Sequence, residues 1–187
     1  YASLSSSFQS HINQSNFSTI LYGENNQVFG KSYQMANGRC AYATQYGQRA
    51  YSNGGFTNGI LGSSQQVEFV QRGETTNAAL TRLYSDGASE EIVIANNSQL
   101  LLNVLVQGFD QAGVESATTQ NFLVVKNVGG VVSLVHQDVI KSHYTNGALA
   151  INTPLNPVND SILVTVNGLA GVNMYWTAYI YGVEVRV

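Results

Sequence analysis

Short runs of alternating apolar and polar residues, separated by glycines, make up the first third of the chain. Between residues 23 and 62 a glycine recurs every seven to nine residues. Glycine supplies the positive-φ positions of tight turns, so each interval predicts a strand, a turn and a strand. Two intervals span about 15–16 residues, which predicts one coil of a small β-roll. The glycines of this repeat are Gly23, Gly30, Gly38, Gly47, Gly55 and Gly62.

The segment before the repeat has a different pattern. Leu4, Phe8 and Ile12 recur every four residues in a serine-rich stretch, and this narrow apolar stripe favours a short helix. Residues 1–16 are therefore either the end of a helical stalk that packs against partner chains or a frayed terminal linker. The chain begins at Tyr1 without a methionine, so we expect a fragment or a processed product.

A roll of so few coils, assigned to residues 17–64, buries little core of its own. We therefore interpret it as a neck that is supported by other copies of the chain. Aromatic residues of the neck and the apolar stripe before it are the expected contacts between copies. These candidate interface residues are Leu4, Phe8, Ile12, Tyr33, Tyr42 and Tyr51.

Residues 65–187 have the pattern of an antiparallel β-sandwich, jelly-roll-like in style. Strands are expected roughly every 8–12 residues with turn residues between them. Asp86-Gly87 predicts a hairpin, and a second hairpin is expected between 118–126 and 130–137. Tyr175 and Trp176 are adjacent on the last long strand and must point to opposite faces, with Trp176 expected in the core. The fold class is therefore predicted to be all-β, with a short N-terminal helix as the one exception.

Composition limits the partners. Only 10% of the 187 residues are charged, against roughly 25% in an average soluble protein, and the net charge is −3. The electrostatic attraction that nucleic-acid binding needs is missing. No apolar run is long enough to span a membrane, so membrane insertion is not expected. Eleven tyrosines and many uncharged polar residues favour short-range contacts at an extracellular or virion surface, including contacts to sugars.

Candidate chemistry is sparse. Asp110 and Glu115 share one loop, where a glycosidase carboxylate pair is conceivable but solvated loop acids are the favoured interpretation. His136, Asp138 and His143 have a spacing that a metal could use, although exposed strand and loop residues explain it better. Cys40 is the only cysteine, which excludes an intrachain disulfide. No catalytic motif is present, so the chain is predicted not to be an enzyme and to need no cofactor or metal.

Several short motifs occur along the second part of the chain: Gly73-Glu74-Thr75-Thr76-Asn77, Asp86-Gly87 after Leu83, Asn96-Asn97-Ser98, Glu115-Ser116-Ala117 before Phe122, Asn146-Gly147-Ala148-Leu149, Trp176-Thr177-Ala178 and Val183-Glu184-Val185. Together they resemble a C-terminal module that is common in bacteriophage tail fibres and other virion structural proteins. The resemblance covers roughly residues 65–187 and includes no catalytic signature. The glycine repeat is similar in style to the β-roll heads of trimeric adhesins, but Tyr33 and Met35 stand where alanine is usual.

The resemblance implies a homotrimeric virion fibre protein that binds a host surface polysaccharide or protein through its β-sandwich. A capsid-decorating or head-fibre protein, whose partners are other virion proteins, is the alternative, and a depolymerase that cuts host glycan is the third. Loop position and polarity suggest receptor contacts in three loops, 108–116, 143–147 and 153–159. The candidate contact residues are Asp110, Gln111, Glu115, Tyr144, Asn146 and Asn156.

Overall fold

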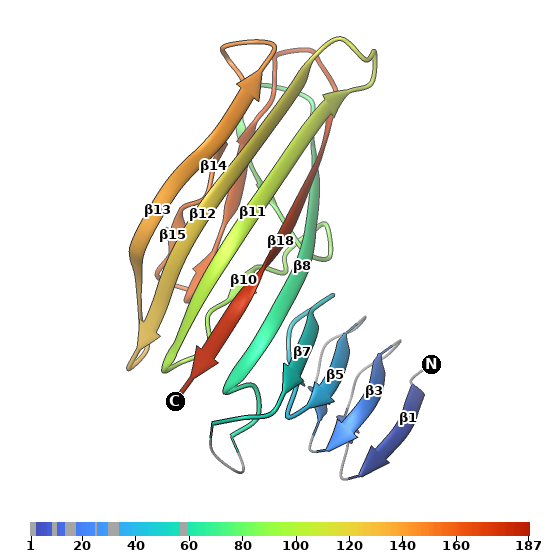
Figure 1. Cartoon of the computed structure of the whole chain (residues 1–187). Helices are drawn as coiled ribbons and strands as arrows, with labels where there is room; N and C mark the ends of the chain where they lie inside the picture. Colours follow the sequence, from blue (N-terminus) through green and yellow to red (C-terminus); the bar gives the residue numbers. More distant parts are fainter. Residues whose placement is uncertain (1–2, 9–10, 14–17, 25, 30–33, 57–59) are drawn as a thin grey trace.

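The computed structural model describes residues 3–8, 11–13, 18–24, 26–29, 34–56 and 60–187, and these residues form strands and loops without a helix (Figure 1). The all-β prediction is confirmed. None of the described segments is a helix that is long and apolar enough to cross a membrane.

The helix predicted from Leu4, Phe8 and Ile12 is wrong. The segment instead forms two strands, β1 (Ser3–Phe8) and β2 (His11–Asn13). Their backbone groups pair with a later part of the chain, as between Ser3 and Thr19 and between His11 and Gln27. Serine-rich sequence makes a poor isolated helix, and a ready parallel partner satisfies the backbone better.

Strands β1 to β7, which we call the coils, stack in parallel as two ladders. Ser3 pairs with Thr19, Thr19 with Met35, and Met35 with Arg49, so the pairing repeats at about the interval that the glycine spacing predicts. One ladder contains β1, β3 (Thr19–Glu24), β5 (Met35–Arg39) and β7 (Arg49–Asn53), and the other contains β2, β4 (Gln27–Phe29) and β6 (Tyr42–Ala43).

The coil interior that the structure describes holds mostly small side chains. Alanines occupy most of its buried apolar positions, so these positions contribute little apolar volume. Gly38, near the end of β5, has a positive φ, and glycine is required there because a Cβ would overlap the carbonyl oxygen of Ser52 on β7. Among the coil side chains that the structure describes, the buried apolar residues are Ile20, Val28, Ala36, Ala41, Ala43 and Ala50.

A nine-stranded sheet runs from the coils into residues 64–187, which we call the head. Its order is β1-β3-β5-β7-β8-β18-β11-β12-β13, and the pairing changes from parallel to antiparallel between β7 and β8 (Figure 1). The long strands of the head are β8 (Ser64–Thr75), β11 (Ser98–Asp110), β12 (Ser116–Val128), β13 (Val131–Tyr144) and β18 (Met174–Arg186).

The head also contains two small sheets, ordered β14-β17-β9 and β10-β16-β15. Residues of both sheets share one hydrophobic core with the head part of the large sheet. Trp176 is buried in this core as predicted, and its indole Nε1 donates a hydrogen bond to Oγ1 of Thr75 at 2.9 Å. The strands of the small sheets are β9 (Leu80–Leu83), β10 (Ile92–Val93), β14 (Ala150–Asn152), β15 (Leu155–Asn156), β16 (Ser161–Ile162) and β17 (Val164–Asn167).

The hairpin expected at Asp86-Gly87 is wrong, because the strands on either side enter different sheets. Asp86 instead organises a wider turn. Burial would raise the pKa of its carboxyl, but hydrogen bonds from the backbone N–H groups of Glu90, Ser89 and Ala88 outweigh this and lower the pKa to about 2. The hairpin between β12 and β13 is confirmed, with two glycines of positive φ, 129 and 130, at its turn.

A buried polar cluster joins the coils to the head. Glu184 on β18 accepts hydrogen bonds from Gln65 on β8 (2.7 Å) and from Arg186 (2.6 Å and 3.0 Å). The Gln65 amide also bonds the backbone N–H and carbonyl of Tyr42 in the coils, and the Arg186 guanidinium lies 5.4 Å from the centre of the Tyr42 ring.

Close contact between Gly108 and Trp176 provides a test of the head packing. A Cβ at Gly108 would overlap the Trp176 ring, which its hydrogen bond to Thr75 holds in place. We predict that Gly108→Ala lowers the free energy of unfolding by about 1–3 kcal/mol through overpacking. Gly147→Ala is the control, because its Cβ would meet nothing within 4 Å. Equal stability of the two variants in chemical denaturation would contradict the packing.

Candidate functional site

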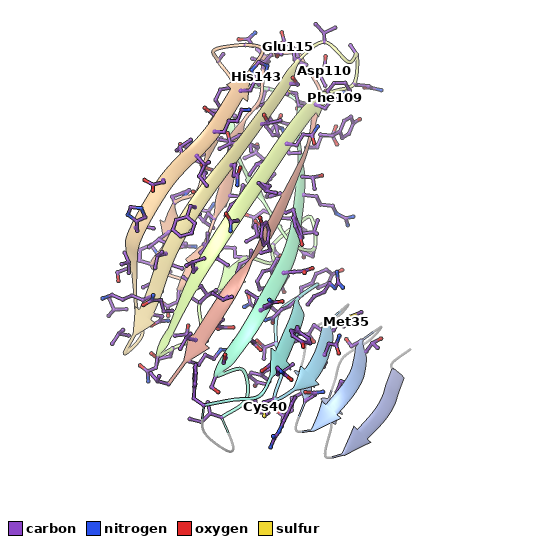
Figure 2. All side chains as sticks on the ribbon, viewed as in Figure 1. Met35, Cys40, Phe109, Asp110, Glu115 and His143 are labelled. Atoms are coloured by element: carbon purple, nitrogen blue, oxygen red, sulfur yellow. The ribbon has the colours of Figure 1, made fainter. Side chains whose placement is uncertain are left out.

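Loops 110–116 and 143–147 meet at the end of the head furthest from the N-terminus (Figures 1 and 2). Thr145 links the two loops: its Oγ1 donates to the Glu115 carboxylate at 2.5 Å and accepts from the backbone N–H of Ser116 at 2.8 Å. The Asn146 amide is 3.5 Å from the other Glu115 oxygen. The structure therefore brings Glu115 and Asn146 onto one distal surface with Asp110 buried beneath it, and contact of these residues with a receptor stays a prediction.

Asp110 has a structural role at the distal end. Its side chain is buried, and Oδ1 accepts hydrogen bonds from the backbone N–H groups of Val114 (2.7 Å) and Glu115 (3.0 Å). The carboxylate thus fixes the loop in which it lies. Tyr144 also points inward, where its hydroxyl bonds Oγ1 of Thr119 at 2.9 Å. The remaining candidate of this loop, at position 111, is an exposed glutamine whose side chain a ligand can reach.

Asn156 lies apart from the distal surface. Its amide nitrogen donates a hydrogen bond to the Glu91 carboxylate at 3.0 Å. The side chains of Asn159, Ser161 and Arg82 donate to the same carboxylate. Burial would raise the pKa of Glu91, but these hydrogen bonds, led by that of Ser161, and the charge of Arg82 lower it. Glu91 therefore anchors the 153–160 loop, and sequence reasoning missed it because most of its partners are distant in the sequence.

The sequence predicted that His136, Asp138 and His143 do not form a metal site. His136 Nε2 and Asp138 Oδ2 are 2.8 Å apart on β13, and both side chains are more than half exposed. His136 also makes an edge contact with the Phe122 ring. Within the described parts of the chain, no three such side chains gather closely enough to hold a metal ion.

Aromatic side chains line the outer face of the large sheet, which faces away from the head core. Phe109 and Tyr175 are cross-strand partners near the distal end and are 50% and 51% exposed. Further along β18, Tyr179 stacks on Tyr181 with ring centres 5.2 Å apart. Alternation along β18 places Tyr175 and Tyr179 opposite Trp176, as the sequence predicted for Tyr175, whereas the neighbours of these tyrosines were not predicted.

A hollow of about 510 Å³ lies on this outer face, between the aromatic residues of β18 and the edge strand β13. Burial raises the pKa of Tyr179 at its margin, and the nearby Glu68 carboxylate raises it further. Sequence reasoning missed this hollow because its residues come from four strands. The side chains that line it on the outer face are Leu105, Gln107, Thr118, Gln120, Lys141, Thr177 and Tyr179.

No protein-family model matches the sequence, and no curated protein is similar to it in sequence. Solved structures that are similar to the chain include three tailspike proteins, and each likeness covers 88% of the chain. They are the tailspike protein of Acinetobacter baumannii phage AM24 (9% identity, TM-score 0.37), the tailspike protein gp49 of A. baumannii bacteriophage Fri1 (3%, 0.39) and the tailspike protein of Acinetobacter phage vB_ApiP_P1 (9%, 0.30). The chain spans 33%, 33% and 40% of their respective lengths.

The Fri1 protein is described as a capsular polysaccharide depolymerase. This description contradicts the prediction from the sequence that the present chain is not an enzyme, and that prediction is withdrawn.

The buried carboxylate of Asp110 provides a test of the distal loop. We predict that Asp110→Ala lowers the free energy of unfolding by about 1–3 kcal/mol, because two backbone N–H groups lose their acceptor. Asp138→Ala is the matched control, since the Asp138 side chain is 63% exposed. Chemical denaturation of both variants checks this, and an Asp110→Ala protein as stable as the control would show that the loop does not depend on the carboxylate.

Proposed function

We propose that the chain belongs to a bacteriophage tail component and binds polysaccharide on the host cell surface as a homotrimer. The observation that carries the proposal is the exposed aromatic pair Phe109 and Tyr175 at the distal end of a continuous sheet. Aromatic faces combined with a few placed polar groups are the usual chemistry of a binding surface for an uncharged polar ligand.

The resemblance of residues 65–187 to virion fibre modules agrees with this proposal. So does the low charge of the chain, which leaves short-range hydrogen bonds and aromatic contacts as the means of recognition. Three copies would present three distal surfaces at fixed spacing. Weak sites held in this way gain avidity without any new contact.

Small residues in the coil interior support the trimer. Four of the six buried apolar residues that the structure describes in the coils are alanines, so this part of the coils contributes little apolar core of its own. Tyr51 is 46% exposed on β7 and is available to a partner copy, whereas Tyr42 already contacts Arg186 in its own chain. The other candidates for this interface are Leu4, Phe8 and Ile12, which lie on β1 and β2, and Tyr33, which lies outside the described residues.

Distal substitutions test receptor binding. We predict that the combined variant Phe109→Ser, Gln111→Ala and Tyr175→Ser reduces binding to susceptible host cells at least about tenfold, because each lost contact counts three times in a trimer. The control is Val128→Ser with Val131→Ser, two exposed apolar residues beside the turn of the β12–β13 hairpin, away from the distal loops. Unchanged cell binding by the distal variant would remove the proposed role. Release of reducing sugar ends in the same incubation measures cleavage separately from binding.

Solution mass tests the trimer. We predict a mass three times the 20.2 kDa of one chain, measured by light scattering. Tyr51→Lys should shift the mass towards smaller species, because it places a charge where copies are expected to meet. Tyr175→Lys, at the distal end, should leave the mass unchanged. A monomeric wild-type chain would show that the thin coils need no partner copy.

A further inference from the structure

The hollow on the outer face of the large sheet lies within reach of a ligand that is bound at the distal end. Gln107 and Leu105 follow Phe109 at every second position along β11, and therefore on the same face. Thr177 and Tyr179 follow the distal tyrosine at position 175 in the same way on β18. A polymer that contacts the distal aromatic pair can therefore continue into the hollow. A volume of about 510 Å³ is typical of a small-molecule site and accommodates a sugar residue.

The polar side chains of the hollow have hydrogen-bonding capacity to offer. Gln107, Thr118, Gln120 and Thr177 provide two amides and two hydroxyls, and none of these side-chain groups is engaged by another residue in the described part of the protein. Leucine and tyrosine side chains, at 105 and 179, add apolar surface beside them. Planar amides and hydroxyls next to an aromatic ring match the alternating hydroxyl groups and C–H faces of a sugar.

Lys141 gives the hollow its charge. Among the described residues it is the only charged one that lines the hollow, and it forms no ion pair with any of them. Arg49 and Arg186, in contrast, each face a carboxylate, at 3.1 Å and 2.6 Å. Asp138, on the same strand as Lys141, is held by His136. An unpaired ammonium group among neutral hydrogen-bonding side chains favours an anionic ligand.

We propose that this hollow is a binding subsite for an acidic sugar residue, whose carboxylate pairs with Lys141. The proposal rests on the proposed function, because the acidic residue would belong to the polysaccharide that the distal end binds. A second copy of the chain that packs against the same face is the competing occupant, and the experiment below separates the two.

The test uses the full chain, short oligogalacturonate as the acidic probe and malto-oligosaccharide of equal length as the neutral probe. In calorimetric titrations at low salt, the wild-type chain should bind the acidic probe more tightly than the neutral one. Lys141→Gln should weaken binding of the acidic probe about fivefold, the upper end for one exposed ion pair, and Lys141→Arg should preserve it. Lys126→Gln, the matched control on β12, should have no effect, because Lys126 does not line this hollow.

The subsite is overturned if the wild-type chain does not bind the acidic probe, if Lys141→Gln binds it as well as the wild type, or if Lys126→Gln weakens binding equally. A lower solution mass of the Lys141→Gln variant would assign the face to contacts between copies and would also overturn it. The proposed function fails separately, through unchanged host-cell binding by the Phe109, Gln111 and Tyr175 variant. Loss of cell binding in that variant with no effect of Lys141→Gln would remove only the subsite.

Discussion

The buried carboxylate of Glu184 is the interaction on which the join between coils and head depends. A charge that is removed from water must be paired and hydrogen-bonded, and the loss of a partner from such a pair costs about 3–5 kcal/mol. Gln65 and Arg186 provide the partners, and Gln65 also holds the backbone of Tyr42 in the second ladder of the coils. Three segments from separate parts of the sequence are therefore fixed to one another where the pairing changes from parallel to antiparallel.

This join allows one sheet to run from the coils to the distal end of the head. Trp176, hydrogen-bonded to Thr75, fills the head core next to Gly108, so β8, β18 and β11 cannot shift past one another easily. At the far end, the buried Asp110 and the contact of Thr145 with the carboxylate at position 115 fix the loops. A surface that is held in this way loses little conformational freedom when it binds, which favours affinity.

Local chemistry in the sequence predicted the features that depend on neighbouring residues. Glycine spacing predicted the interval at which the strands of the coils pair, and alternation along β18 separated Trp176 from Tyr175. The strand β1 was missed because its partner lies in the next coil and no local pattern signals it. Lys141 was missed for a similar reason. Extra residues on β13, at Val135 and Ile140, shift its register against β12, and a bulge of this kind decides which side chains share a face.

The division of polar groups between structure and surface explains where recognition can take place. The two acids that the sequence singled out in a loop already have partners, since Asp110 fixes its own loop and Glu115 binds Thr145. Glu91, which the sequence did not single out, anchors the 153–160 loop. Groups that already have partners gain little from a ligand, because each new hydrogen bond replaces an existing one. On the outer face, by contrast, a ligand displaces only water from the side-chain amides and hydroxyls and from the ammonium group of Lys141. Recognition is therefore expected to depend more on the sheet face than on the carboxylates of the loops.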